Sequence, residues 1–187
     1  MSAEDLLIPG PDHGGIPRAP FVANVADFVT STEDVDRVIQ QFQEAIAKYK
    51  FMQESLQKTA ANLMEKIPDI RKTLQTVEFL GARKADDPDL VVDFELNDTL
   101  YAKAEVSHTE TVNIWLGANV MVEYPIPEAQ EMLSERLNTA EASLKTTEEN
   151  LEFIREQITT MEVNTARIYN WSVEQRRMER EGQTAEQ

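Results

Sequence analysis

The stretch from residue 91 to residue 124 constrains the fold of this chain more than any other. In four short runs within it, apolar residues occupy every second position, with mostly polar residues between them. Such alternation is typical of a half-buried strand, because successive side chains point to opposite faces. Turn-forming residues separate the runs in each pair, at Asn97-Asp98 and at Gly117-Ala118-Asn119. We therefore predict two β-hairpins over residues 90–124.

The apolar faces of these hairpins need a partner, because an isolated two-stranded hairpin is at best marginally stable in water. The flanking segments use their own apolar stripes on each other, so we expect the hairpins to pack against hairpins of other chains. The alternative is that these residues form an ordinary core within one chain. The predicted subunit-interface residues are Val92, Phe94, Leu96, Leu100, Ile114, Leu116, Val120 and Val122.

Two long heptad patterns flank the hairpins and predict helices over residues 33–84 and 127–178. Pro68 lies inside the first pattern, but the heptad resumes in phase at Ile70, so we expect a bend rather than a break. The helices are nearly equal in length and are joined by a compact insert, which favours antiparallel pairing within one chain. The predicted fold class is mainly α: a long antiparallel intrachain coiled coil with two β-hairpins between its helices.

The two ends of the chain lack this regularity. Residues 1–30 predict a flexible segment, rich in glycine and proline at its start, with a short amphipathic helix between Phe21 and Val29. Two interpretations of that helix stay open: it folds back on the long helices, or it presents an apolar site to a partner. Residues 181–187 predict a disordered tail. The body between these ends, residues 31–180, forms one predicted domain.

Composition excludes several classes of function. A formal net charge of −16 and a pI near 4.5 argue against nucleic acid and against an anionic membrane surface as partners. The charge favours solubility, with basic protein partners as the second interpretation. The chain has no cysteine, and its two histidines, His13 and His108, both lie in predicted loops. We therefore expect no disulfide, no metal site and no cofactor.

Catalytic motifs and targeting segments are also lacking in this sequence. It contains no glycine-rich phosphate loop, nucleophile elbow or HExxH motif. The carboxylates of Glu148, Glu149 and Glu152 belong to a predicted solvated helix face, so we expect no enzyme. With no signal-peptide pattern and no long apolar run, we expect a cytoplasmic protein, with the nucleus as a second location left open.

Three phrases of the sequence resemble a known family. They are Gly15–Val22 (GIPRAPFV), Asn113–Tyr124 (NIWLGANVMVEY) and Thr165–Trp171 (TARIYNW). Together with the order helix, double hairpin and helix, they resemble alpha-type prefoldin subunits, and among these the eukaryotic subunit 3 type. The resemblance covers about residues 15 to 178, and the Trp-Leu-Gly-Ala-Asn-Val run is its most specific part. The segment before Ser31 departs from the simpler archaeal alpha subunits.

The resemblance implies a hexameric cochaperone in which this chain joins one further alpha-type and four beta-type subunits. In that family the hairpins assemble into an intersubunit double β-barrel, from which six coiled coils project. Their tips hold unfolded actin or tubulin and deliver it to the cytosolic chaperonin without ATP hydrolysis. Because both share the fold, a scaffold or adaptor subunit of a prefoldin-like complex, including one that binds a ligase component, stays open as an alternative.

Apolar and aromatic residues gather where the predicted coiled coil ends and its seam gives way. Such residues suit non-native chains that expose hydrophobic segments, so we predict client contacts there. The alternative is that some of these residues only close the coiled coil. The predicted client-binding residues are Ile168, Tyr169, Trp171, Phe21 and Phe28.

Overall fold

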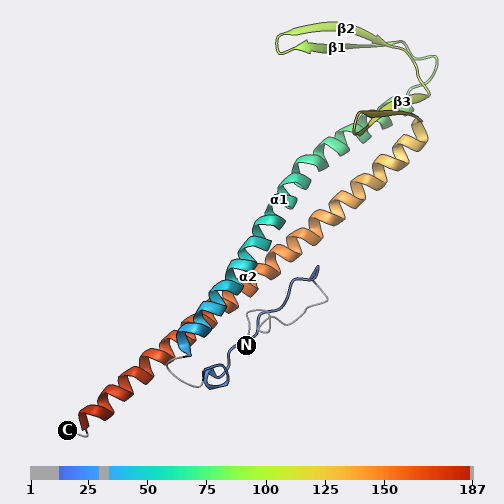
Figure 1. Ribbon diagram of the computed structural model, residues 1–187. Coiled ribbons are helices and arrows are strands. Elements are labelled where there is room, and N and C mark those ends of the chain that lie inside the picture. The colour runs from blue at the N-terminus through green and yellow to red at the C-terminus, as the bar shows by residue number, and fades with distance from the viewer. Residues whose placement is uncertain (1–12, 30–33, 186–187) are drawn as a thin grey trace. The chain divides into compact units, whose positions relative to one another are not determined.

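The computed structural model describes residues 13–29 and 34–185 (Figure 1). In chain order its elements are a 3₁₀ turn η1 (Val25–Asp27), helix α1 (Val35–Ala82), strands β1 (Leu90–Asn97), β2 (Leu100–Val106), β3 (Thr111–Gly117) and β4 (Val120–Pro125), and helix α2 (Ile126–Ala185). The strands form two separate two-stranded antiparallel sheets, β1–β2 and β3–β4. The predicted fold class, two long helices with two hairpins between them, is confirmed.

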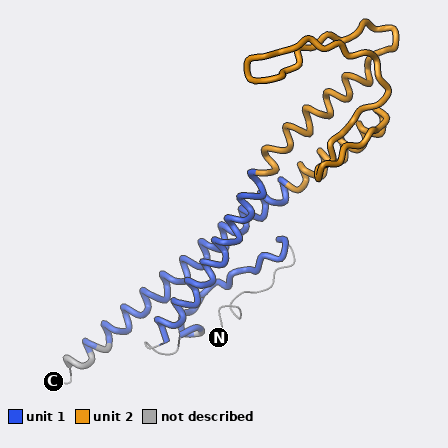
Figure 2. Tube along the Cα trace, turned by 45° about the horizontal axis from the view of Figure 1, so that its top comes forward, with its two compact units in different colours: residues 1–61, 144–187 blue, residues 62–143 orange. Residues whose placement is uncertain are grey.

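The chain divides into two compact units (Figure 2). Unit 1 comprises residues 1–61 and 144–187, and unit 2 comprises residues 62–143. Both helices contribute to both units, and each unit has a hydrophobic cluster of its own. The units are therefore described separately.

In unit 1 the core lies between the first part of α1 and the last part of α2. Its largest fully buried side chains include Phe42 and Tyr49 from α1 and Ile154, Met161 and Ile168 from α2. Residues early in α1 therefore meet residues late in α2, as antiparallel pairing requires. Lys50 and Glu162 add an ion pair of 3.9 Å between the two helices.

The segment before α1 differs from the prediction. Residues 13–29 contain only the single turn η1, whose start is capped by the Asn24 side chain, so the predicted amphipathic helix over residues 21–29 is wrong. The described part is also packed rather than loose, because Val22 and Val29 are fully buried in the unit 1 core. Of the two interpretations, folding back on the helices is the one the structure shows. The rest of the predicted flexible segment, residues 1–12 and residue 30, lies outside the described residues.

The far end of α2 also differs from the prediction. The helix continues to Ala185, past the predicted end at 178, so residues 181–185 are helical where we expected a disordered tail. Arg177 donates from Nε to Glu181 Oε1 at 2.8 Å, and an i,i+4 ion pair of this kind stabilises a solvated helix without tertiary contacts. Residues 186–187 lie outside the described residues.

In unit 2 the second half of α1 packs against the start of α2. Val77 of α1 lies in one cluster with Ile126, Ala129 and Leu133 of α2. Gly81 permits this approach, because a Cβ atom there would lie 2.8 Å from Ile126 Cγ2. Pro68 lies inside α1 without ending it, so the helix is unbroken, as predicted.

The two units pair their helices in the same register. Arg71 of α1 forms an ion pair with Glu141 of α2 in unit 2, as Lys50 does with Glu162 in unit 1. Lys50 and Arg71 are three heptads apart in the sequence, and so are Glu141 and Glu162. A heptad seam that stays in phase on both helices accounts for this match.

The buried Tyr49 makes the stability of unit 1 sensitive to alkaline pH. Burial raises the pKa of Tyr49 to about 12, from 10.0, and its hydroxyl donates to the Pro17 carbonyl oxygen at 2.8 Å. Because the folded state has the higher pKa, the stability that this group contributes is complete below pH 10. It is lost as the pH rises from 10 through 12, by up to about 1.4 kcal/mol per pH unit.

We therefore expect Tyr49→Phe to cost roughly 1 kcal/mol at neutral pH, through the lost hydrogen bond, and to flatten the fall in stability above pH 10. Denaturant unfolding followed by circular dichroism at pH 8, 10 and 11 measures both effects. Tyr169→Phe, at an exposed tyrosine, is the control and should leave the pH profile of the wild type unchanged. A Tyr49→Phe profile as steep as the wild type would show that Tyr49 does not titrate in this range on unfolding.

Candidate functional site

The β1–β2 hairpin carries the first group of predicted interface residues. Its register pairs Val92 with Ala104 and Phe94 with Ala102, which places these side chains on one face. The other face pairs Asp93 with Lys103 and Glu95 with Tyr101. The alternation in the sequence therefore becomes one apolar and one mostly polar face. A bulge between Glu95 and Asn97 shifts the register next to the turn, at Leu96.

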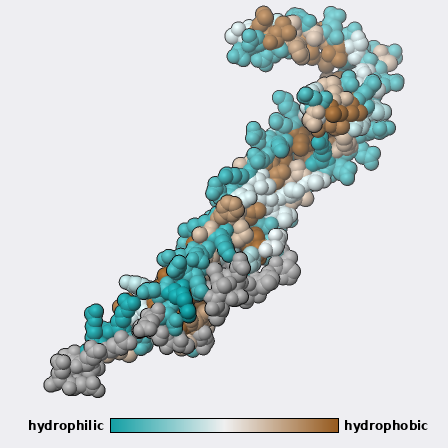
Figure 3. Space-filling model, in the orientation of Figure 1, coloured by the Kyte–Doolittle hydropathy of each residue, from teal (hydrophilic) through white to brown (hydrophobic). Residues whose placement is uncertain are grey.

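The apolar face of this hairpin is uncovered. Phe94, Leu96 and Leu100 are exposed by 60%, 58% and 57%, while Val92 is half-buried. Figure 3 shows apolar surface on this hairpin, which Figure 1 labels. None of its residues belongs to either hydrophobic cluster that the structure describes. As a two-stranded sheet it also leaves the outer edges of β1 and β2 without a neighbouring strand.

The β3–β4 hairpin differs, because its own chain covers part of it. Ile114 is buried in the unit 2 cluster, packed with Ile126 and Leu133 of α2, so it is core rather than the free interface residue we predicted. The physical reason is that α2 begins directly after β4, and the Ile126 amide donates to the Glu110 carbonyl oxygen at 3.0 Å, which holds the start of the helix beside the hairpin. Of the other predicted residues here, Leu116 and Val120 are exposed and Val122 is half-buried.

Two exposed apolar residues of this hairpin were not predicted. Trp115 and Met121 are register partners on the face opposite Ile114, and each is exposed by 56%. They were missed because they occupy the alternating positions that we assigned to the mostly polar face of the hairpin. The turn beside them is tight, with positive φ at Gly117, Ala118 and Asn119. Left-handed backbone of this kind matches the twist of a hairpin, and it suits glycine and asparagine better than alanine.

The predicted client-binding residues lie in unit 1, and the structure divides them. Ile168 is fully buried in the core, so it closes the coiled coil and is not a free contact. Trp171 and Phe28 are partly buried against the same core, and the ring of Phe28 meets Phe42 edge-on at 6.5 Å between centroids. Phe21 and Tyr169 are exposed, by 60% and 59%.

Sequence reasoning missed a set of polar side chains in unit 1. Tyr49 of α1 and Gln157, Asn164 and Arg167 of α2 hydrogen-bond the main chain of residues 17–23. We call residues 16–23 the strap. Gln157 and Asn164 are themselves buried, which is unusual for amide side chains and requires such partners. Their separation by one heptad was a usable signal, since it places both on one face of α2.

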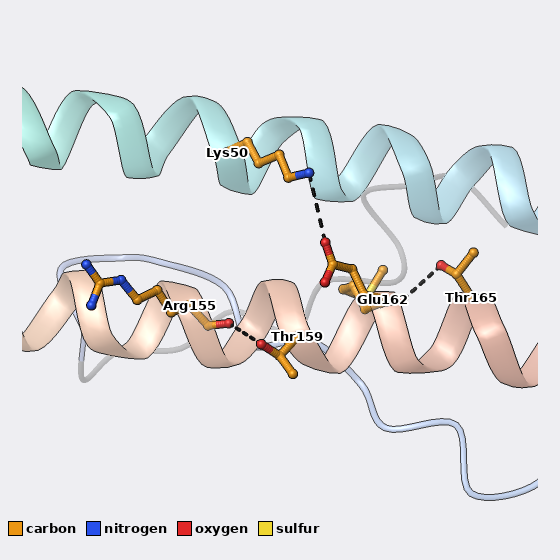
Figure 4. A network of polar contacts seen from close by, with 6 residues as sticks. Lys50, Arg155, Thr159, Glu162 and Thr165 are labelled. Carbon is orange, nitrogen blue, oxygen red and sulfur yellow. Dashed lines mark hydrogen bonds and ion pairs between the residues drawn. The ribbon is translucent and has the colours of Figure 1, made fainter.

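Elsewhere on unit 1 the polar groups satisfy one another (Figure 4). Lys50 reaches across to Glu162, while the Thr159 and Thr165 hydroxyls donate to carbonyl oxygens one turn back on their own helix, those of Arg155 and Met161. Each of these two hydroxyls thus has its one donor hydrogen engaged within its own helix. In the described part of the chain, every buried side-chain polar atom has a hydrogen-bond partner.

Residues 13–29 and 34–185 hold no group of three or more carboxylates and histidines placed to bind a metal ion. Within the same residues, no helix has both the length and the apolar character needed to cross a membrane. The described residues present exposed apolar side chains and a strap held on a coiled coil.

Comparison with known proteins agrees with this architecture. The family model described as "Prefoldin subunit" matches residues 49–171. Prefoldin subunit 3 of Elsinoe fawcettii is 56% identical over 168 residues, covering 90% of this chain and 85% of the relative. Prefoldin subunit 3 of Saccharomyces cerevisiae is 45% identical (87% and 86% covered), and that of Homo sapiens is 43% identical (88% and 84%).

A solved structure shares the fold. A chain of filamentous PFD from Methanocaldococcus jannaschii matches with a TM-score of 0.51 and 17% identity, covering 65% of this chain and 98% of that one. The matched family model spans more than half of the chain, and the curated relatives match along most of their length. This chain therefore belongs to the prefoldin subunit family.

Proposed function

We propose that this chain is an alpha-type subunit of a hexameric prefoldin cochaperone, with one further alpha-type and four beta-type subunits as its partners. The single observation that carries this proposal is the uncovered apolar face of the β1–β2 hairpin. Burying such a face is worth about 25 cal/mol per Å² of apolar area, and the open strand edges offer main-chain hydrogen bonds in addition. Hairpins of neighbouring subunits, joined in an intersubunit β-barrel, would supply both.

The proposed activity is capture of unfolded actin and tubulin at the ends of the coiled coils and delivery to the cytosolic chaperonin, without ATP hydrolysis. Two exposed aromatic side chains in unit 1, Phe21 and Tyr169, support this activity because non-native chains expose apolar segments. Several weak contacts on one client add up through effective concentration, so no single strong site is needed. We place the complex in the cytoplasm.

The hairpin proposal is tested by Phe94→Ser combined with Leu100→Ser. Each side chain loses about 1.5–3 kcal/mol of apolar burial on assembly, so incorporation into the complex should weaken by roughly a hundredfold or more. Native mass spectrometry of the complex reconstituted from six subunits measures incorporation. The matched control is Val91→Ser with Tyr101→Ser, which changes two equally exposed residues on the opposite face of the same hairpin.

Full incorporation of the Phe94/Leu100 variant would contradict the proposed interface. So would equal loss in both variants, because the effect would then not depend on the face. Circular dichroism should show unchanged helix content in both, since neither pair of residues contacts the helices' hydrophobic clusters.

The client-binding proposal is tested by Tyr169→Ser combined with Phe21→Ser. We expect the complex to assemble normally but to need several-fold more protein to suppress aggregation of denatured actin. The loss should be partial, because the other subunits keep their contacts. Phe51→Ser is the matched control: it removes an aromatic residue of α1 that is 75% exposed in the same unit.

Unchanged suppression by the Tyr169/Phe21 variant would remove these two residues from the client-binding surface. If the wild-type complex itself assembles, fails to suppress aggregation and retains one folded partner, the adaptor function replaces the cochaperone function.

A further inference from the structure

Burial along the strap repeats every three residues. Ile16, Ala19 and Val22 are buried, whereas Arg18 and Phe21 between them are exposed. In the sequence this is two turns of apolar-Pro-x, Ile16-Pro17-Arg18 and Ala19-Pro20-Phe21. A repeat of three is the period of a polyproline II helix, and proline pre-sets the backbone dihedral angle that this helix needs.

The coiled coil holds the strap mainly through its main chain. Side chains of α1 and α2 bond five backbone groups of the strap. At the start of the strap, the Tyr49 hydroxyl donates to Pro17 O (2.8 Å) and Gln157 Oε1 accepts from Ala19 N (2.9 Å). Asn164 makes two bonds: its Oδ1 accepts from Val22 N (2.9 Å) and its Nδ2 donates to Pro20 O (2.7 Å). At the end of the strap, Arg167 Nη2 donates to Ala23 O (2.9 Å). Together these four side chains and the apolar positions under the strap form what we call the strap groove.

The spacing of the groove fits an extended chain. Gln157 and Asn164 are one heptad apart, which is about 10.5 Å along a helix. Their partners Ala19 and Val22 are three residues apart, which is about 9.3 Å along a polyproline II segment. Flexible amide side chains absorb the small difference. Asn150, one heptad earlier, lies beside Gly14, where an added Cβ atom would lie 3.1 Å from its Nδ2 atom.

Such a groove should bind polypeptide with little sequence specificity. Its hydrogen bonds go to backbone groups that any residue carries, and its buried positions hold an isoleucine, an alanine and a valine. The occupant also satisfies the groove: with the strap in place, Gln157 Oε1 and both polar atoms of the Asn164 amide bond strap backbone groups instead of being buried without these partners. The chemistry selects an extended polypeptide with a modest apolar side chain at every third residue.

We propose that the strap groove is a binding site for extended segments of non-native polypeptide, and that the strap is a resident occupant which a client segment displaces. This inference rests on the proposed cochaperone function and adds a location and a mode of recognition to it. The strap also carries Phe21, whose ring lies 5.2 Å from the Arg167 guanidinium, so displacement moves one of the two aromatic residues proposed to bind clients. Client binding and strap release are thereby coupled.

The test opens the groove by weakening the strap without touching the groove. Val22→Asp places a charge at a fully buried strap position, and Ala23→Asp places the same charge at the exposed neighbouring position as the matched control. Each variant is reconstituted into the full complex. The probe is a fluorescein-labelled synthetic peptide of residues 13–29, and its binding is measured by fluorescence anisotropy.

We expect the Val22→Asp complex to bind the peptide at least tenfold more tightly than the wild-type and Ala23→Asp complexes. Adding Asn164→Ala to Val22→Asp should remove that gain, because the ligand then loses two main-chain contacts. Unlabelled denatured actin should displace the peptide. A complex whose subunit lacks residues 1–29 should behave like Val22→Asp, which guards against a local effect of the aspartate.

Two outcomes overturn the inference. If neither opened complex binds the peptide better than the wild type, the groove is not a site for free polypeptide. If the peptide binds but denatured actin does not displace it, the groove serves only the chain's own strap. Aggregation suppression by the wild-type complex is measured in parallel, and its absence would instead contradict the proposed cochaperone function.

Discussion

The pairing of α1 with α2 determines what the rest of the molecule can do. Each helix turns its apolar stripe toward the other, and in both units most of the buried apolar residues come from the two helices together. Once the stripes are used in this way, little helical surface remains to cover the hairpins. The β3–β4 hairpin is joined directly to the start of α2, and its Ile114 packs in the same cluster as residues of that helix. The β1–β2 hairpin contributes no residue to either cluster, and its apolar face is exposed in the single chain.

The strap uses what the helix pairing leaves in unit 1. Coiled-coil packing buries the seam but leaves a furrow between the helices, into which the strap inserts Val22. The polar residues that flank the seam then bind backbone rather than water. Asn164 and Gln157 are buried amides that look out of place in a coiled coil considered alone, and they become reasonable once the strap is present. The strap thus adds a third, non-helical segment to a coiled coil that the heptad pattern describes as two helices.

Local patterns predicted the elements, and tertiary contacts decided the exceptions. Alternation and heptads located four strands and two helices, with every boundary but the end of α2 within a few residues, because both periods are set by the backbone itself. Residues 21–29 were mistaken for a helix because Phe21, Val25 and Phe28 also suit a helical spacing. Nothing in that spacing reports the contacts with α1 and α2 that bury Val22 and Val29. Ile114 was assigned to the interface because nothing in its own strand reports that Ile126 and Leu133 lie against it. Tyr169 and Ile168 are neighbours in sequence with opposite exposure, which no composition argument separates.

The uncovered hairpin has a consequence for the supply of this protein. A copy synthesised without its partners would display Phe94, Leu96 and Leu100 to solvent, along with unpaired strand edges that invite aggregation. Surplus copies would thus resemble the unfolded proteins that quality-control systems remove. A single copy of the chain is therefore more prone to aggregate than one whose hairpin is covered.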